Sequence, residues 1–172
     1  RRQRQMCIRD RRCIVKSDLA RVANDFILKA YEENLYLLPT KLLKLVYFMY
    51  GHYLQRTGDI LFDAKFNALE HGPVIFELYD CIKGLGDVDQ FLESEDGKLY
   101  ITNRNSEYGK KYYDVFNYVW NKYRLFSANT LSNLTHAPNS PWDVTRRIKG
   151  KNKEIDAELI KRYFKGEDIS NG

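Results

Sequence analysis

Apolar residues recur along most of the chain at the three- and four-residue spacing that is typical of amphipathic helices. The most regular pattern covers about residues 105–126, where Tyr112, Phe116 and Trp120 share one face with other apolar side chains. Segments beginning at Ser17 and Thr40 show the same period. The second of them has apolar residues on two faces, so we expect it at the centre of the fold. Shorter helices are predicted at about 73–83, 127–135, 140–144 and 153–165.

Two stretches interrupt the helical pattern. In residues 90–102, "QFLESEDGKLYIT", apolar residues lie on either side of Asp96-Gly97. This pair favours a tight turn and hence a small β-hairpin. Residues 60–73, "ILFDAKFNALEHGP", carry little helical signal and are predicted to be extended. Gly72-Pro73 is a turn signal, and proline suits the first position of the helix expected to follow it. The pattern therefore predicts a mainly α protein, a compact single-domain bundle of about six helices over residues 17–166 with one small hairpin, followed by a tail at 167–172.

The composition is that of a globular protein, with 172 residues, 44% apolar content and 14% aromatic content. No run of about 18 apolar residues occurs, so we expect no membrane span, no secretory leader and a cytoplasmic location. The net charge of +5 is unevenly placed: residues 1–16 hold seven of the 28 Lys and Arg but one of the 23 Asp and Glu. That stretch therefore carries +6 and the remainder −1. It is interpreted either as a disordered nucleic-acid-binding arm or as a gene-model artefact, because "RQRQMCIRDR" resembles translated adapter sequence.

Side chains that carry chemistry are scattered. Cys7, Cys13 and Cys81 show no paired spacing and are expected to be reduced thiols of a cytosolic protein. No histidine has a second ligand nearby in sequence, so we predict no metal site, no cofactor and no catalytic group. The enzymatic alternative would assemble a site from His71, His136 and Cys81.

The basic run 146–153, "RRIKGKNK", has two interpretations. It is either a solvated loop between helices or, as the basis of an alternative function, the phosphate-contacting segment of a nucleic-acid-binding regulator. The residues of this alternative are Arg146, Arg147, Lys149, Lys151 and Lys153.

Three segments, in order, resemble the Panacea antitoxin domain, the family of SocA-like and phage-associated GepA-like proteins. They are "KLLKLVYFMYGHYL" at 41–54, "LFDAKFNALEHGPVIFELY" at 61–79 and "LSNLTHAPNSPW" at 131–142. The resemblance covers about residues 18–165. Departures from the family pattern include His52 and Leu69, each at a position where the family has tryptophan. Leu43, Tyr50 and Phe76 also depart from it.

The resemblance implies a non-enzymatic antitoxin that binds and neutralises a toxin encoded nearby, in a bacterial or phage-infected cytoplasm. It also implies a second mode, in which the domain is an adaptor that delivers the toxin to a cytosolic protease. Motif positions with an expected structural role are Lys44, Tyr47, Gly51, Val74 and Tyr79.

The corner at 71–73 is interpreted either as purely structural or as one half of a recognition surface that faces "THAPNSPW". In the second interpretation Trp142, which lies beside prolines, would be a rigid aromatic anchor. The toxin-binding candidates are His71, Gly72, Pro73, His136, Pro141 and Trp142.

Overall fold

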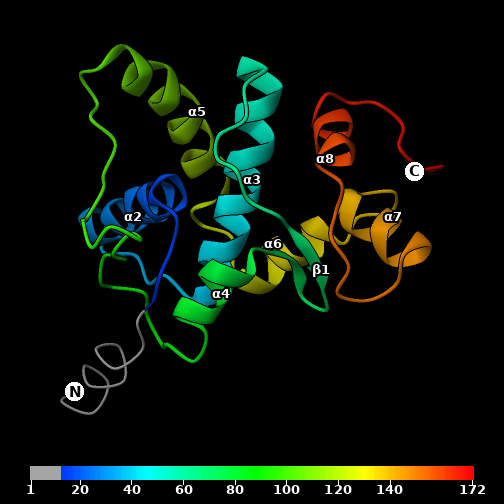
Figure 1. Cartoon of the computed structure of the whole chain (residues 1–172), viewed down its shortest axis with the longest axis horizontal. Coiled ribbons are helices and arrows are strands. Elements are labelled where there is room, and N and C mark those ends of the chain that lie inside the picture. The colour runs from blue at the N-terminus through cyan, green and yellow to red at the C-terminus, as the bar shows by residue number, and fades with distance from the viewer. Residues whose placement is uncertain (1–12) are drawn as a thin grey trace.

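The computed structural model describes residues 13–172, so the predictions for residues 1–12, Cys7 included, lie outside the described part of the chain. That part contains seven helices and one two-stranded antiparallel sheet (Figure 1). The helices are α2 (Ser17–Glu32), α3 (Pro39–Thr57), α4 (Phe76–Ile82), α5 (Glu107–Tyr123), α6 (Ala128–Thr135), α7 (Pro141–Ile148) and α8 (Ala157–Phe164). The strands are β1 (Asn67–Leu69) and β2 (Gly72–Val74). The prediction of a mainly α fold with a small hairpin is confirmed.

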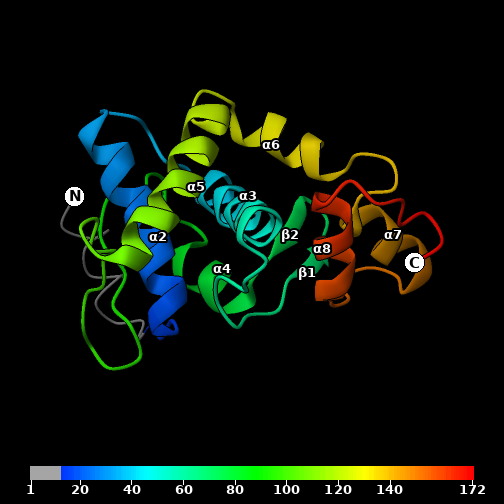
Figure 2. The ribbon, with the colours of Figure 1, turned by 90° about the horizontal axis from the view of Figure 1, so that it is seen from above.

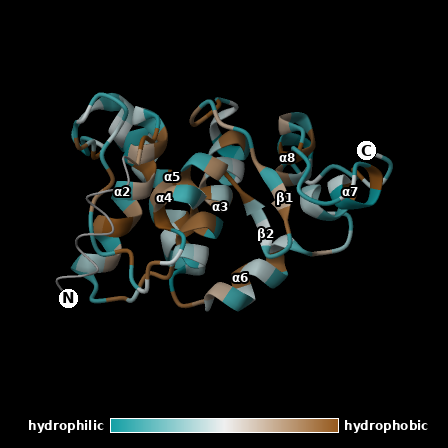
Figure 3. Ribbon diagram, turned by 60° about the horizontal axis from the view of Figure 1, so that its bottom comes forward, coloured by the Kyte–Doolittle hydropathy of each residue, from teal (hydrophilic) through white to brown (hydrophobic). Residues whose placement is uncertain are grey.

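Helix α3 is the centre of the fold, as its two apolar faces predicted. Every residue from Leu42 to Leu54 is buried, and α3 packs against α2, α4, α5, α6, α8 and β2. Figure 2 shows α3 nearly end-on in the middle of the molecule, between α5 and the sheet. In Figure 3 the hydrophobic colouring is concentrated around α3 and α4, whereas the outer helix α6 is largely pale or hydrophilic. The close packing leaves no space at Gly51, where an added Cβ would lie 2.3 Å from the ring of Phe164.

Most helix ends follow local sequence signals. Ser106, Ser127 and Ser140 each accept a hydrogen bond from a backbone N–H in the first turn of the helix that follows. Helix α3 begins at Pro39, one residue before the predicted start at Thr40, and has no side-chain cap. Gly58, with φ +76°, ends α3 in the left-handed conformation that glycine favours.

The hairpin lies elsewhere than predicted. Asp96 and Gly97 do form a tight turn, in which Ser94 N–H donates to the Lys98 carbonyl. The residues around that turn bond to other elements, however, because Asn24 on α2 holds the backbone at Leu92 and Tyr100. No ladder therefore forms there.

The antiparallel ladder forms instead at the Gly-Pro corner. Asn67 pairs with Val74, Ala68 with Pro73 and Leu69 with Gly72. The extended prediction for this stretch is confirmed, but the prediction that a helix begins at Pro73 is wrong. Gly72 has φ +117°, which is not a helical value, and α4 begins three residues after Pro73, at Phe76.

The last predicted helix also begins later than expected. Residues 152–155 run along β1, where Ala68 N–H donates to the Lys153 carbonyl at 2.8 Å and Ile155 N–H to the Phe66 carbonyl at 2.8 Å. Helix α8 therefore starts only at Ala157. The packed chain extends past the expected limits at 17 and 166, because Val15 and Ile169 are both buried.

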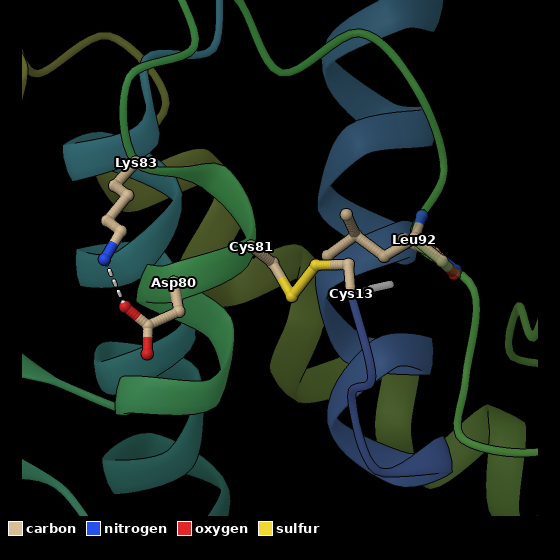
Figure 4. Close-up of a disulfide and its surroundings, with 6 residues drawn as sticks. Cys13, Asp80, Cys81, Lys83 and Leu92 are labelled. Carbon is tan, nitrogen blue, oxygen red and sulfur yellow. Dashed lines mark hydrogen bonds and ion pairs between the residues drawn. A yellow bond between two sulfur atoms is a disulfide. The ribbon is translucent and has the colours of Figure 1, made fainter. Parts of the chain in front are cut away.

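Cys13 and Cys81 form a disulfide, with their Cα atoms 5.2 Å apart (Figure 4). The prediction of reduced thiols is therefore wrong for this pair. The bond joins the segment before α2 to α4 across a sequence separation of 68 residues. Such a distance gives no recognisable cysteine motif, and Cys13 had been grouped with the tail. Among the described helices, none is long and apolar enough to cross a membrane.

Candidate functional site

The hairpin turn places Gly72 against two other parts of the chain. Glu70 and His71 connect the strands and are exposed, whereas Gly72 is buried. A Cβ at Gly72 would lie 2.5 Å from Thr135 Oγ1 and 2.7 Å from Lys44 Cε. With φ at +117°, this position requires glycine for both its backbone conformation and its space.

Lys44 lies beneath the turn and is fully buried. Its Nζ donates a hydrogen bond to the carbonyl oxygen of Pro73 at 3.0 Å. Burial lowers the pKa of Lys44 from its ordinary value of 10.5 to about 7, because the charged ammonium loses its hydration. Lys44 thus connects α3 to β2 through this hydrogen bond. At neutral pH its buried amine is partly uncharged.

Trp142, on α7, is the link between the corner and the "THAPNSPW" segment. Its indole Nε1 donates to the Leu69 carbonyl at 2.6 Å. The imidazole of His136 stacks on the indole with 3.8 Å between ring centroids and 19° between planes. The guanidinium of Arg146 lies 4.9 Å from the indole ring and donates to the Ala68 carbonyl at 2.9 Å. Trp142 is half-buried and its polar atom is satisfied within the chain.

The charged side chains around His136 in this region are basic. Burial lowers the pKa of His136, and the positive charges of Lys44 and Arg146 lower it further. The Nε2 atom of His136 is buried and has no hydrogen-bond partner among the described residues. We call Lys44, Gly72, Pro73, Thr135, His136, Trp142 and Arg146 the corner cluster.

The loop between α6 and α7 holds these side chains in place. Ser140 Oγ donates to the Thr135 carbonyl at 2.8 Å and also caps α7. Asp143 accepts a hydrogen bond from the Asn139 N–H at 2.9 Å. Pro141 is buried at the first turn of α7, where its missing N–H needs no partner. The loop is therefore cross-linked by its own hydrogen bonds and presents a fixed backbone.

The structure brings together most of the predicted site residues. Gly72, Pro73, His136 and Trp142 lie in one cluster, with His71 exposed at the adjacent turn. The corner and "THAPNSPW" thus face each other, an arrangement that is common to the structural and the recognition interpretations. Of the other motif positions, Tyr47, Gly51 and Val74 are buried in the core and Tyr79 is half-buried on α4.

The candidate nucleophile of the enzymatic alternative, Cys81, is not available. Cys81 is bonded to Cys13 and carries no thiol. Within residues 13–172, no group of three or more His, Cys, Asp or Glu side chains is placed to hold a metal ion.

Sequence reasoning missed two members of the cluster, Thr135 and Arg146. Arg146 had been assigned to the nucleic-acid alternative, but it binds the corner. Arg147 donates to the Ser170 carbonyl at 2.7 Å and Lys149 to the Glu154 carbonyl at 3.4 Å, so three of the five basic residues hold protein backbone. Lys151 and Lys153 are exposed. The helical spacing of Trp142 and Arg146, four residues apart, was the one available signal for the missed arginine.

Comparisons with known proteins agree with this organisation. The family model described as "Antitoxin SocA-like, Panacea domain" matches residues 42–143. The chain is also similar to the antitoxin SocA of Caulobacter vibrioides (strain NA1000 / CB15N), with 25% identity over 162 residues that cover 86% of this chain and 80% of that protein. No solved structure matches the chain significantly.

The fold and the corner cluster define a helical domain in which three segments, from α3, the hairpin and the α6–α7 loop, meet at one place. The chain belongs to the SocA-like antitoxin family, the Panacea domain. The matched range contains every member of the corner cluster except Arg146, and the rest of the basic run also falls outside it.

Proposed function

We propose that this protein is the antitoxin of a toxin–antitoxin pair and neutralises a toxin encoded nearby by binding it directly, without chemistry of its own. The main support for the antitoxin role is that the chain belongs to the SocA-like antitoxin family. The similarity to the antitoxin SocA over most of both chains supports it.

We place the toxin-binding surface at the exposed side of the corner cluster, with His71 at the hairpin turn and with the half-buried His136, Trp142 and Arg146. The supporting observation is that Trp142 and Arg146 bond to two successive carbonyls of β1. These contacts hold the turn, the loop and α7 in one arrangement before any partner arrives. A surface ordered in advance loses little conformational entropy on binding.

A growth assay with matched surface variants tests this proposal. The neighbouring reading frame is expressed from an inducible promoter, with and without this chain, and the two products are co-purified. We expect this chain to restore growth and to co-purify with the toxin. His71→Glu should weaken both, and Lys110→Glu should weaken neither, since both residues are exposed but Lys110 lies on α5. A neighbour that is harmless, or that is not rescued, contradicts the antitoxin role, while equal behaviour of the two variants contradicts the placement.

The adaptor mode and direct blocking are distinguished by measuring rescue in host strains with and without the protease. If the domain acts by delivering the toxin to a protease, rescue fails in a strain that lacks that protease, although the complex still forms. If the domain blocks the toxin by binding, rescue persists in that strain. We propose direct blocking as the principal mode, because it requires only the pre-ordered surface.

A further inference from the structure

A second surface, away from the corner cluster, has the chemistry of a binding site. A pocket of about 430 Å³ is lined by residues from α2, the segments at 61 and 101–106, and the first turn of α5. Helices α2 and α5 lie at the opposite end of the molecule from α7 and α8 (Figures 1 and 2). The pocket therefore does not share residues with the proposed toxin-binding surface.

Arg21 supplies the positive charge of this pocket. Its side chain is only 13% exposed, and its guanidinium donates to Thr102 Oγ1 at 2.6 Å and to Tyr108 Oη at 2.8 Å. The guanidinium carbon also lies 5.1 Å from the centroid of the Tyr108 ring. These neutral partners hold the group in one orientation without neutralising it.

The charge of Arg21 has no hydrogen-bonded carboxylate among the described residues. Asp18, which also lines the pocket, forms a solvent-exposed ion pair with Arg21, 3.6 Å from Nη2, and its side chain is 69% exposed. Asp25 lies deeper, and its carboxylate accepts hydrogen bonds from the Thr102 N–H and hydroxyl rather than from Arg21. A desolvated guanidinium gains most from a charge-assisted, two-pronged hydrogen bond to a carboxylate. The pocket therefore offers a site for a carboxylate from another molecule.

The lining of the pocket is mixed: Asp18, Arg21, Thr102, Asn103 and Ser106 are polar or charged, and Leu61, Ile101 and Tyr108 are apolar. Leu61 is buried, while Ile101 is 41% and Tyr108 43% exposed. Ile60, next to Leu61 in sequence, is 65% exposed. The loop that carries Ile60 is held against α5 by the 2.8 Å ion pair between Lys111 and Asp59. A cation in the floor with exposed apolar side chains at the rim suits a peptide that combines a carboxylate with an apolar neighbour.

We propose that this pocket binds a carboxylate-bearing peptide segment of a protein partner, with Arg21 as the group that receives the carboxylate. Thr102 and Tyr108 are positioning residues that orient the guanidinium. Ile101, which is exposed at the rim, contacts the apolar side chain next to the carboxylate. The carboxylate comes either from an acidic side chain or from a chain end, which share the same chemistry.

Three capped dipeptides test the proposal by nuclear magnetic resonance on the full chain. They are acetyl-alanyl-leucine with a free chain end, acetyl-glutamyl-leucinamide with a side-chain carboxylate, and acetyl-alanyl-leucinamide with no carboxylate. We expect at least one of the first two to shift the Arg21 Nε–H signal and the amide signals of Thr102 and Tyr108 at millimolar concentration. The neutral peptide should bind at least about tenfold more weakly. Equal binding of all three, or no shift with any, overturns the proposal, and the first two tell the two carboxylate sources apart.

Two exposed substitutions with opposite expected effects separate binding from a structural role of Arg21. Asp18→Asn removes the competing carboxylate and should tighten binding of the active peptide about threefold. Ile101→Glu places a negative charge at the rim and should weaken it at least about tenfold. Neither residue is buried, so both variants keep the fold, which the amide spectrum verifies. Effects of the same sign, or no effect of either substitution, contradict the proposed role of the pocket.

Discussion

The indole nitrogen of Trp142 and the carbonyl oxygen of Leu69 are joined by a 2.6 Å hydrogen bond that connects α7 to the end of β1. Trp142→Phe keeps an aromatic ring beside His136 but removes this bond. We expect the free energy of unfolding to fall by about 1 kcal/mol, the usual net value of one hydrogen bond. Urea denaturation measures the change. Toxin binding should weaken as well, because the hairpin is no longer fastened to α7. Unchanged stability and unchanged binding would show that the bond does not hold the corner.

Gly72→Ala should be among the most destabilising single substitutions in the chain. Its Cβ would meet Thr135 Oγ1 and Lys44 Cε at less than 3 Å, in a backbone conformation that L residues rarely adopt. We expect a loss of at least about 3 kcal/mol. The matched control is Gly97→Ala, where φ is +74° and nothing lies within 4 Å, so only the backbone cost of about 1 kcal/mol applies. Equal losses in the two variants would contradict the close packing at the corner.

The buried Lys44 predicts a dependence of stability on pH. Its pKa is lowered to about 7 in the folded chain and returns to 10.5 on unfolding. Between these values the unfolded state binds more protons, so the free energy of unfolding rises with pH, by about 2 kcal/mol from about pH 7 to about pH 9. Burial raises the pKa of Tyr47 and Tyr123, and those residues oppose the trend only above about pH 10.

Lys44→Met tests the assignment of this pH dependence. The variant leaves the Pro73 carbonyl without its donor, so its absolute stability changes, but it has no group that titrates at this position. We therefore expect its stability to rise much less over the same pH range, with the remaining rise due to Lys41, whose pKa burial also lowers. The check is a series of urea denaturations of both proteins at several pH values. A slope that survives undiminished in Lys44→Met would assign the effect to another group.

Reduction of the disulfide between Cys13 and Cys81 should lower stability without unfolding the core. The bond closes a loop across 68 residues of sequence, for which loop entropy in the unfolded chain gives at most about 4.5 kcal/mol. All proteins in this comparison carry Cys7→Ser, so that a single pair of thiols remains. Melting with and without dithiothreitol should differ for this background and not for its Cys13→Ser derivative. A titration that finds two free thiols in the non-reduced background would contradict the bond.

The outer basic residues should be dispensable for toxin binding. Lys151 and Lys153 are exposed and lie outside the family match. We expect the double substitution Lys151→Gln, Lys153→Gln to leave co-purification with the toxin unchanged, whereas Arg146→Gln reduces it by detaching the guanidinium from Ala68. The reverse ranking, with binding that falls steeply as salt is raised, would favour the nucleic-acid alternative.

The long helices could be predicted because their own sequences determine them. α2, α3 and α5 carry unbroken periodic apolar faces, and Ser106 and Gly58 mark ends that need no tertiary partner. The hairpin could not be placed in this way. The turn at Asp96-Gly97 has the stronger local signal, yet Asn24 takes the hydrogen bonds of the backbone around it.

The sheet at the corner depends on distant contacts that no local pattern reports. Lys44 binds one strand, and Trp142 and Arg146 bind the other. The candidate residues of the corner were found through family motifs, and their facing arrangement agrees with the structure. Arg146 was missed because a basic run favours an interpretation as a solvated or nucleic-acid-binding segment. The disulfide was missed because Cys13 and Cys81 are far apart in sequence.

The most direct test of the account is the growth of cells that express the neighbouring gene product together with this chain. We expect that the neighbour alone arrests growth, that this chain restores growth, and that Trp142→Phe and His71→Glu reduce the restoration while Lys110→Glu does not. Growth that is never arrested, or arrest that this chain never relieves, would contradict the proposed antitoxin function.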